Sequence, residues 1–134
     1  MLLLDTGVWV ALGEPEDRHC SAARAIVLDF STPLAALDLT LYEVANVVGA
    51  KKGRHDDAKD LAQLVLTRCR DRLARVDGHL VVSVVEIVAE HGLTAYDAAY
   101  VAAARRYGWT LVSTDVADLV SKGLAVTPDG ADYP

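Results

Sequence analysis

Short apolar runs alternate with amphipathic segments along the whole chain. The runs that predict buried strands cover residues 1–4, 32–37, 73–77, 109–114 and 124–127. The segments between them carry helical spacing of apolar residues, or helix start and stop signals, over residues 6–13, 19–30, 40–52, 56–73, 78–91, 93–106 and 115–123. Strands that alternate with helices predict an α/β domain with a mainly parallel sheet of four to five strands and right-handed crossovers.

Length and composition narrow the class of protein. The 134 residues suffice for one domain with a core, and no linker or repeat divides them, so we expect a single domain over residues 1–134. No apolar run approaches the ~18 residues that a membrane span needs, and the start shows neither a basic leader nor a cleavage site. Cys20 and Cys69 lack metal-ligand spacing. We therefore expect reduced core thiols in a cytoplasmic protein without membrane contact.

The charge distribution argues against a protein that holds nucleic acid by a bulk positive field. The net charge is −6, yet most of the 13 Lys and Arg residues fall between Lys51 and Arg75. Acidic residues such as Asp56 and Asp60 are interleaved with them, which favours the solvated face of a helix over a phosphate-binding surface. The histidines have no zinc spacing and are expected at the surface or at helix ends; they are His19, His55, His79 and His91.

Several acidic residues follow predicted strands or open predicted helices. Asp5 ends the first strand and Asp115 ends the fourth. Glu43 and Asp97 stand in the first turns of their helices, in the similar sequences TLYE and TAYD. Because open parallel sheets bind ligands at the carboxyl ends of their strands, we expect Asp5, Glu43 and Asp115 on that edge. Asp97 joins them only if tertiary packing brings it there, and Asp118 follows Asp115 by one helical turn.

Each acid also has a local explanation. Asp5 and Asp115 can be N-caps, whereas Glu43 and Asp97 can complete capping boxes, the latter with Thr94. Carboxylates about 5 Å apart, however, repel by about 3 kcal/mol per pair at an effective dielectric constant of about 20, which exceeds what a helix N-terminus offsets. A divalent cation offsets more, and oxygen ligands suit Mg²⁺ or Mn²⁺. Without a nucleotide-binding loop, such a site favours metal-assisted attack of water on a phosphate ester.

The chain resembles the PIN-domain proteins, and in particular the VapC-type toxins of bacterial toxin–antitoxin pairs. The segments that carry this resemblance are LLLDT, TLYEVANVV, GLTAYDAAYVAAARRYG and TLVSTD, in this order. The resemblance covers nearly the whole chain and implies a three-layer, PIN-like (Rossmann-like) fold. It further implies a metal-dependent endoribonuclease that cuts RNA and so inhibits translation. It also implies a homodimer and a cognate VapB-type antitoxin, which often places a basic side chain among the acids.

The resemblance assigns roles to individual residues. Those that would hold one or two Mg²⁺ or Mn²⁺ ions are Asp5, Glu43, Asp97 and Asp115. Thr6 and Ser113 would support the site through their hydroxyls, and Asp118 would be a fifth acid. Asn46 would bond substrate or water, unless it is an ordinary helix-surface residue. Gly7 stands where the family often has Ser or Asn, and its lack of a side chain removes a hydrogen bond and weakens the positioning of the metal.

The role of Asp38, the role of several apolar residues and the type of activity each have more than one explanation. Asp38 is interpreted as a turn residue rather than a further ligand. Core packing is favoured over contact with an antitoxin or second subunit for Trp9, Val10, Leu12, Leu41 and Val44. The alternatives to a ribonuclease are a catalytically silent PIN-fold binding module and a metal-dependent DNA nuclease or phosphatase on the same scaffold. The complete acidic set argues against the silent module.

Overall fold

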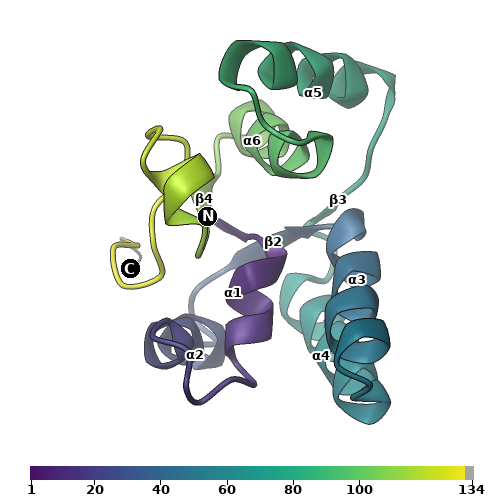
Figure 1. Ribbon diagram of the computed structural model, residues 1–134, viewed down its shortest axis with the longest axis vertical. Helices are drawn as coiled ribbons and strands as arrows, with labels where there is room; N and C mark the ends of the chain where they lie inside the picture. The colour runs from purple at the N-terminus through teal and green to yellow at the C-terminus, as the bar shows by residue number, and fades with distance from the viewer. Residues whose placement is uncertain (132–134) are drawn as a thin grey trace.

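The protein, seen in a computed structural model that describes residues 1–131, is built on a four-stranded parallel sheet. The strands are β1 (Leu2–Leu4), β2 (Leu34–Leu37), β3 (Leu73–Ala74) and β4 (Thr110–Val112). Their order is β3-β2-β1-β4 (Figure 1). Leu2 of β1 pairs with Leu34 on one side and with Thr110 on the other. The predicted parallel sheet is confirmed.

The fifth strand expected over residues 124–127 is wrong. Within the described residues this segment contributes a single parallel bridge, between Val126 and Val112. Gly123 turns the chain in the left-handed region, at φ +71°, and Pro128 supplies no backbone donor. Val126 is therefore the one residue of this segment that pairs with β4.

The six α-helices follow the predicted order. They are α1 (Thr6–Ala11), α2 (Cys20–Leu28), α3 (Asp38–Val44), α4 (His55–Cys69), α5 (Gly78–His91) and α6 (Ala95–Tyr107). Two π-helical segments, η1 (Ala45–Lys51) and η2 (Val116–Val120), continue α3 and follow β4. The boundary expected at Thr40 is wrong, because α3 begins at Asp38 and the Thr40 side chain is fully buried. Asp38 therefore opens α3 and is not a turn residue.

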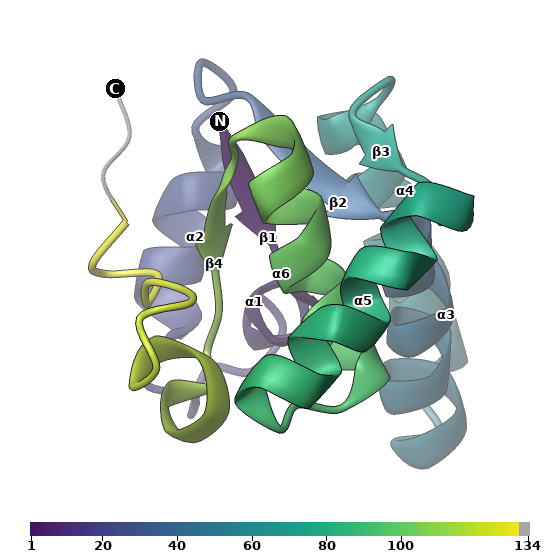
Figure 2. The ribbon, with the colours of Figure 1, turned by 90° about the horizontal axis from the view of Figure 1, so that it is seen from above.

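The alternation of side chains along β1 and β2 divides the core between the two faces of the sheet. Leu2, Leu4 and Ala36 pack with Trp9 and other apolar residues of α1, α2 and α4. Leu3 and its neighbours on the other face pack against α5 and α6. Figure 2 shows α5 and α6 in front of the sheet and α2 behind it. The expected three-layer arrangement is confirmed.

Most of the apolar residues that were weighed between core packing and a protein contact belong to the core. Trp9 and Val44 are fully buried, whereas Val10, Leu12 and Leu41 are half-buried. Both cysteines are buried and free. His19 is buried at the N-terminal end of α2, one of the helix-end positions expected of the histidines. No helix of the described residues is long and apolar enough to cross a membrane.

The basic segment between Lys51 and Arg75 is largely bonded within the molecule. Lys52 and Arg54 both form salt bridges with Glu14. Arg68 is buried and donates to the backbone carbonyls of residues 27, 29 and 32, which fixes the loop between α2 and β2. The prediction of a solvated helix face therefore fails for Arg68.

Candidate metal centre

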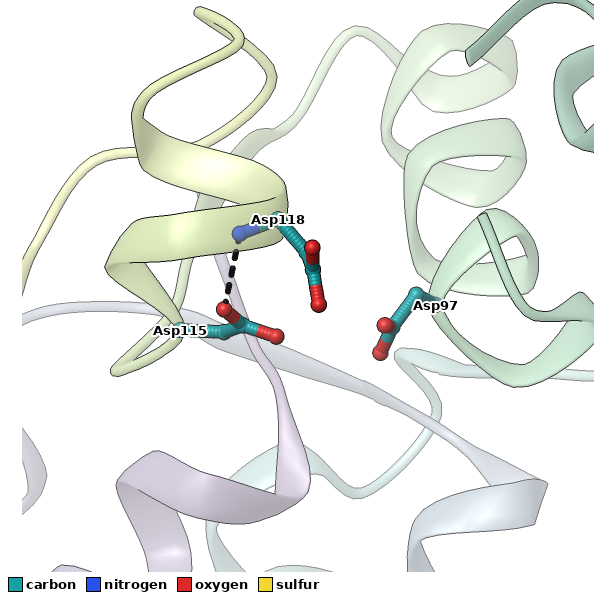
Figure 3. Close-up of side chains that lie close together, drawn as sticks. All are labelled: Asp97, Asp115 and Asp118. Atoms are coloured by element: carbon teal, nitrogen blue, oxygen red, sulfur yellow. Dashed lines mark hydrogen bonds between the residues drawn. The ribbon is translucent and has the colours of Figure 1, made fainter. Parts of the chain in front are cut away.

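Three carboxylates from two distant parts of the chain meet at the carboxyl edge of the sheet. One oxygen from each of Asp97, Asp115 and Asp118 lies within 4.8 Å of the other two. Figure 3 shows the three side chains directed into one space between the first turn of α6 and η2. The tertiary packing that Asp97 required is thus present, and Asp118 lies within the group.

Asp5 is anchored at the base of this site, directly after β1. Its Oδ1 accepts from the backbone N–H of Val8 at 3.2 Å and its Oδ2 accepts from the hydroxyl of Ser113. The same hydroxyl oxygen of Ser113 accepts from the backbone N–H of Asp115 at 2.9 Å. Ser113 therefore connects two acids that follow neighbouring strands.

Burial dominates the electrostatics of Asp5. Its side chain is almost inaccessible, and burial raises its pKa to about 7, with smaller contributions from the negative charges of Asp97 and Glu43. Hydrogen bonds from Ser113 and Val8 oppose this rise in pKa. The carboxyl group is therefore held in an environment that resists negative charge unless a cation compensates for it.

Glu43 is held by hydroxyl groups from two helices, α1 and α6. Its Oε1 accepts from Thr6 at 2.7 Å and from the phenol of Tyr100 at 2.8 Å. The Tyr100 oxygen also lies 2.7 Å from the Thr40 hydroxyl and 2.8 Å from that of Thr6. Burial, aided by the Glu43 charge, raises the pKa of Tyr100 well above its usual value, so the phenol stays protonated and can donate.

Tyr100 is a site residue that was not predicted from the sequence. The signal was its position three residues after Asp97, which places both side chains on the same face of a helix. Glu43 itself does not close a capping box, because it is the sixth residue of α3 and that helix has no side-chain cap. Its local explanation is therefore wrong, and its contacts to Thr6 and Tyr100 account for its place.

The local explanations of the other acids hold only in part. The Thr94 hydroxyl caps α6 by accepting from the backbone N–H of Asp97 at 3.2 Å, and its hydrogen bond with the Asp97 side chain is the smallest influence on the pKa of that carboxylate. Asp5 caps α1, and Asp115 caps η2 by accepting from the N–H of Asp118 at 2.9 Å. Capping thus explains the backbone at these positions and leaves Oδ2 of Asp115 without a hydrogen bond among the described residues.

The carboxylates of the site lie close together, and no basic side chain among the described residues pairs with them. Among the described residues, no Lys, Arg or His forms a salt bridge with the site acids, which are Asp5, Glu43, Asp97, Asp115 and Asp118. The pKa of Asp97 is raised by burial first and then by the charges of Asp115, Asp118 and Glu43. Carboxylate and hydroxyl oxygens with a large uncompensated charge suit a hard cation such as Mg²⁺ or Mn²⁺.

Three other residues named from the sequence are placed as follows. Asn46 is exposed at the start of η1 and forms no hydrogen bond within the described residues. Asp38 accepts from the backbone N–H of Leu39 and is not one of the grouped carboxylates. At Gly7 an added Cβ would lie 2.3 Å from Oγ1 of Thr114, so a side chain at this position requires Thr114 to move.

The fold and this acidic site define an α/β protein of the PIN class. Residues 2–118 match the PIN domain, and the chain belongs to the PIN domain family. It is 32% identical to Ribonuclease VapC3 of Pyrobaculum aerophilum over 118 residues, which cover 85% of this chain and 88% of that protein. The resemblance inferred from the four sequence segments is confirmed.

Solved structures share the fold over nearly the whole chain. The structure of VapC20 from Mycobacterium tuberculosis, described as a Sarcin-Ricin loop cleaving toxin, superposes with a TM-score of 0.77 at 20% identity and covers 100% of both chains. A toxin–antitoxin complex from Klebsiella pneumoniae gives a TM-score of 0.72 at 18% identity, and covers 96% of this chain and 98% of that one. At these identities the likeness concerns the fold.

Proposed function

We propose that this protein is a metal-dependent endoribonuclease that acts as the toxin of a toxin–antitoxin pair. The observation that carries the proposal is the meeting of Asp97, Asp115 and Asp118 within 4.8 Å, without a basic partner among the described residues. Asp5 and Glu43 complete the same edge and share its electrostatic field. The similarity to a ribonuclease of the VapC type supports RNA as the substrate.

In this proposal Asp5, Glu43, Asp97 and Asp115 hold one or two Mg²⁺ or Mn²⁺ ions, with Asp118 as a fifth acid. A bound ion of this kind lowers the pKa of water and stabilises negative charge on a phosphodiester during its hydrolysis. Thr6 and Tyr100 fix Oε1 of Glu43 and leave Oε2 available. Ser113 orients Asp5 through its hydroxyl and Asp115 through its backbone.

The same uncompensated acids suit a protein partner that inserts a basic side chain, as expected of a VapB-type antitoxin. The similar toxin–antitoxin complex from Klebsiella pneumoniae supports such a partner. A homodimer also belongs to this proposal. Exposed valines on α5, which include Val82 and Val85 at 58% and 64% exposure, are compatible with a protein contact.

The experiment that tests the proposal is cleavage of a total-RNA pool by the purified chain with Mg²⁺, with Mn²⁺ or with EDTA. Asp5→Asn is compared with Asp56→Asn, which alters an exposed carboxylate in the first turn of α4. We expect discrete fragments that require the metal, disappear in Asp5→Asn and persist in Asp56→Asn. Parallel reactions with single-stranded DNA and with a phosphate monoester identify a DNA nuclease or a phosphatase. Mn²⁺ binding without cleavage of any substrate would contradict the proposal and favour a binding module.

A further inference from the structure

Gly7, the second residue of α1, leaves a space that the side chain of Thr114 occupies. A Cβ at residue 7 would lie 2.3 Å from Oγ1 of Thr114. The backbone does not require glycine here, because Gly7 is helical and its φ is not positive. A glycine within a helix costs up to about 1 kcal/mol relative to alanine. The first turn of α1 therefore carries an unfavourable residue at the point where the Thr114 hydroxyl approaches it.

The same point places this hydroxyl beside Asp5. The Cβ position at residue 7 lies 3.4 Å from Oδ1 of Asp5 as well as 2.3 Å from Oγ1 of Thr114. On one side of Thr114 in the chain, Ser113 donates to Oδ2 of Asp5. On the other side is Asp115, one of the three grouped acids. The Thr114 side chain is half-buried, and its hydroxyl lies at the acidic site against the first turn of α1.

The Thr114 hydroxyl has no hydrogen bond within residues 1–131, and Asp5 receives its hydrogen bonds from Ser113 and Val8 instead. The other hydroxyl groups around the acids each bond an acid or a neighbouring hydroxyl; they belong to Thr6, Thr40, Thr94, Tyr100 and Ser113. Their protons are thus used within the protein. The Thr114 proton is available to a ligand that brings acceptor oxygens.

We propose that the Thr114 hydroxyl donates to a non-bridging oxygen of the phosphodiester held at the acids, which makes Thr114 a substrate-binding residue; this inference rests on the proposed ribonuclease function. A phosphodiester is anionic, and nearby carboxylates repel it. A hydroxyl donor offsets part of this repulsion, because hydrogen bonds to charged groups are stronger than those between neutral groups. Unlike a lysine or arginine, threonine carries no charge, so it forms no ion pair with the carboxylates that are proposed to hold the metal.

The test uses a single-stranded RNA oligonucleotide that spans a cut mapped in the total-RNA pool. Thr114→Val keeps the shape of the side chain and removes the donor. We expect kcat/KM to fall about tenfold, which corresponds to about 1.4 kcal/mol for a lost hydrogen bond to a charged group. The Mn²⁺ dissociation constant and the melting temperature in EDTA should keep their wild-type values, because Asp5 retains its hydrogen bonds from Ser113 and Val8.

Two single variants accompany this measurement. Thr114→Ser keeps the hydroxyl and should restore most of kcat/KM, which a role of the methyl group in packing would not allow. Thr110→Val makes the same change at an exposed threonine at the start of β4, the strand that precedes Thr114. It should leave kcat/KM unchanged.

Moving the hydroxyl across the contact gives a second test. Thr114→Ala clears the space beside residue 7, and Gly7→Ser then carries a hydroxyl into it. The double variant Gly7→Ser/Thr114→Ala should therefore recover much of the kcat/KM that Thr114→Ala loses. Its matched control is Gly7→Ala/Thr114→Ala, which fills the space without a hydroxyl and should not recover it.

Three results would overturn this inference alone. They are a wild-type kcat/KM in Thr114→Val, a loss that neither Thr114→Ser nor the serine at residue 7 restores, and a weaker Mn²⁺ affinity in Thr114→Val. The last two would assign Thr114 to packing or to metal binding. A wild-type chain that cleaves no RNA would overturn the proposed function as well.

Discussion

The phenol of Tyr100 donates a 2.8 Å hydrogen bond to Oε1 of Glu43, which lies 57 residues earlier in the chain. This bond joins α6 to α3 at the carboxyl edge of the sheet and fixes the direction of one site acid. Thr6, which follows Asp5, donates to the same oxygen at 2.7 Å. The position of Glu43 thus depends on a network that spans three helices.

Replacement of Tyr100 by phenylalanine tests this network. Tyr100→Phe keeps the buried ring but removes the donor to Glu43, so we expect Mn²⁺ affinity to fall by roughly 10-fold or more, as is typical when a residue that orients a metal ligand is lost. The free energy of unfolding should fall by about 1 kcal/mol. Calorimetric titration with Mn²⁺ and thermal unfolding in EDTA measure the two effects.

The matched control is Tyr107→Phe, on the same helix but at an exposed position whose hydroxyl forms no hydrogen bond within the described residues. It should leave Mn²⁺ affinity unchanged. Equal Mn²⁺ affinity in both variants would show that Tyr100 does not position Glu43 for metal binding.

Asp97→Asn separates the metal role of this residue from helix capping. The substitution leaves the backbone N–H that Thr94 caps and removes one charge beside Asp115 and Asp118. We expect cleavage and tight Mn²⁺ binding to be lost, while the metal-free protein is at least as stable as wild type, because like-charge repulsion is relieved. Urea unfolding in EDTA and the total-RNA assay measure these outcomes, with Asp56→Asn as the control. Lower stability together with retained cleavage would contradict the assignment.

Asp5 should make the stability of the metal-free protein depend on pH. Its pKa is about 7 in the folded protein and near 3.8 when unfolded, so between these values the folded state binds the additional proton. The free energy of unfolding contributed by Asp5 therefore decreases as pH rises through this window, by up to about 1.4 kcal/mol per pH unit. Asp5→Asn removes this decrease.

Urea titrations in EDTA at about pH 5 and about pH 8 check the sign. The stability of Asp5→Asn relative to wild type should be greater at the higher pH. Mg²⁺ should raise wild-type stability most at the higher pH, where Asp5 is ionised. A difference between variant and wild type that is constant with pH would contradict the raised pKa.

We expect that residue 7 must be glycine because Thr114 lies so close, and not because of the backbone conformation at residue 7. A Cβ at residue 7 would lie 2.3 Å from Oγ1 of Thr114, so we expect Gly7→Ala to lower the free energy of unfolding by about 1–3 kcal/mol. Thr114→Ala removes the obstructing atom. The double variant should therefore be more stable than the sum of the two single changes predicts, as a double-mutant cycle would show.

Gly78→Ala serves as the control for this cycle, because a methyl group there meets nothing within 4 Å in the first turn of α5. It should leave stability unchanged or slightly increase it, since alanine restricts the unfolded chain. Additive effects of Gly7→Ala and Thr114→Ala would show that the two side chains do not compete for space.

The periodicity of apolar residues by itself determined the parallel α/β architecture, since each strand and helix must bury one repeating face. It also placed Asp5 directly after β1, whereas Asp115 follows the end of β4 by three residues and not directly. Element boundaries were less certain. Thr40 had the sequence of a cap, yet its hydroxyl bonds Tyr100 inside the core, and the segment around Val126 gave one bridge where a strand was expected.

Only the tertiary structure decided which of these acids meet. Asp97 joins Asp115 and Asp118 because α6 packs across the sheet and presents its first turn to η2. Tyr100 reaches Glu43 for the same reason, and Arg68 is buried because the end of α2 and the loop before β2 together offer it three carbonyls. Local patterns encode which face of an element is buried. The angle and depth at which two elements pack are set by contacts between residues far apart in the chain, and those contacts determine the geometry of the site.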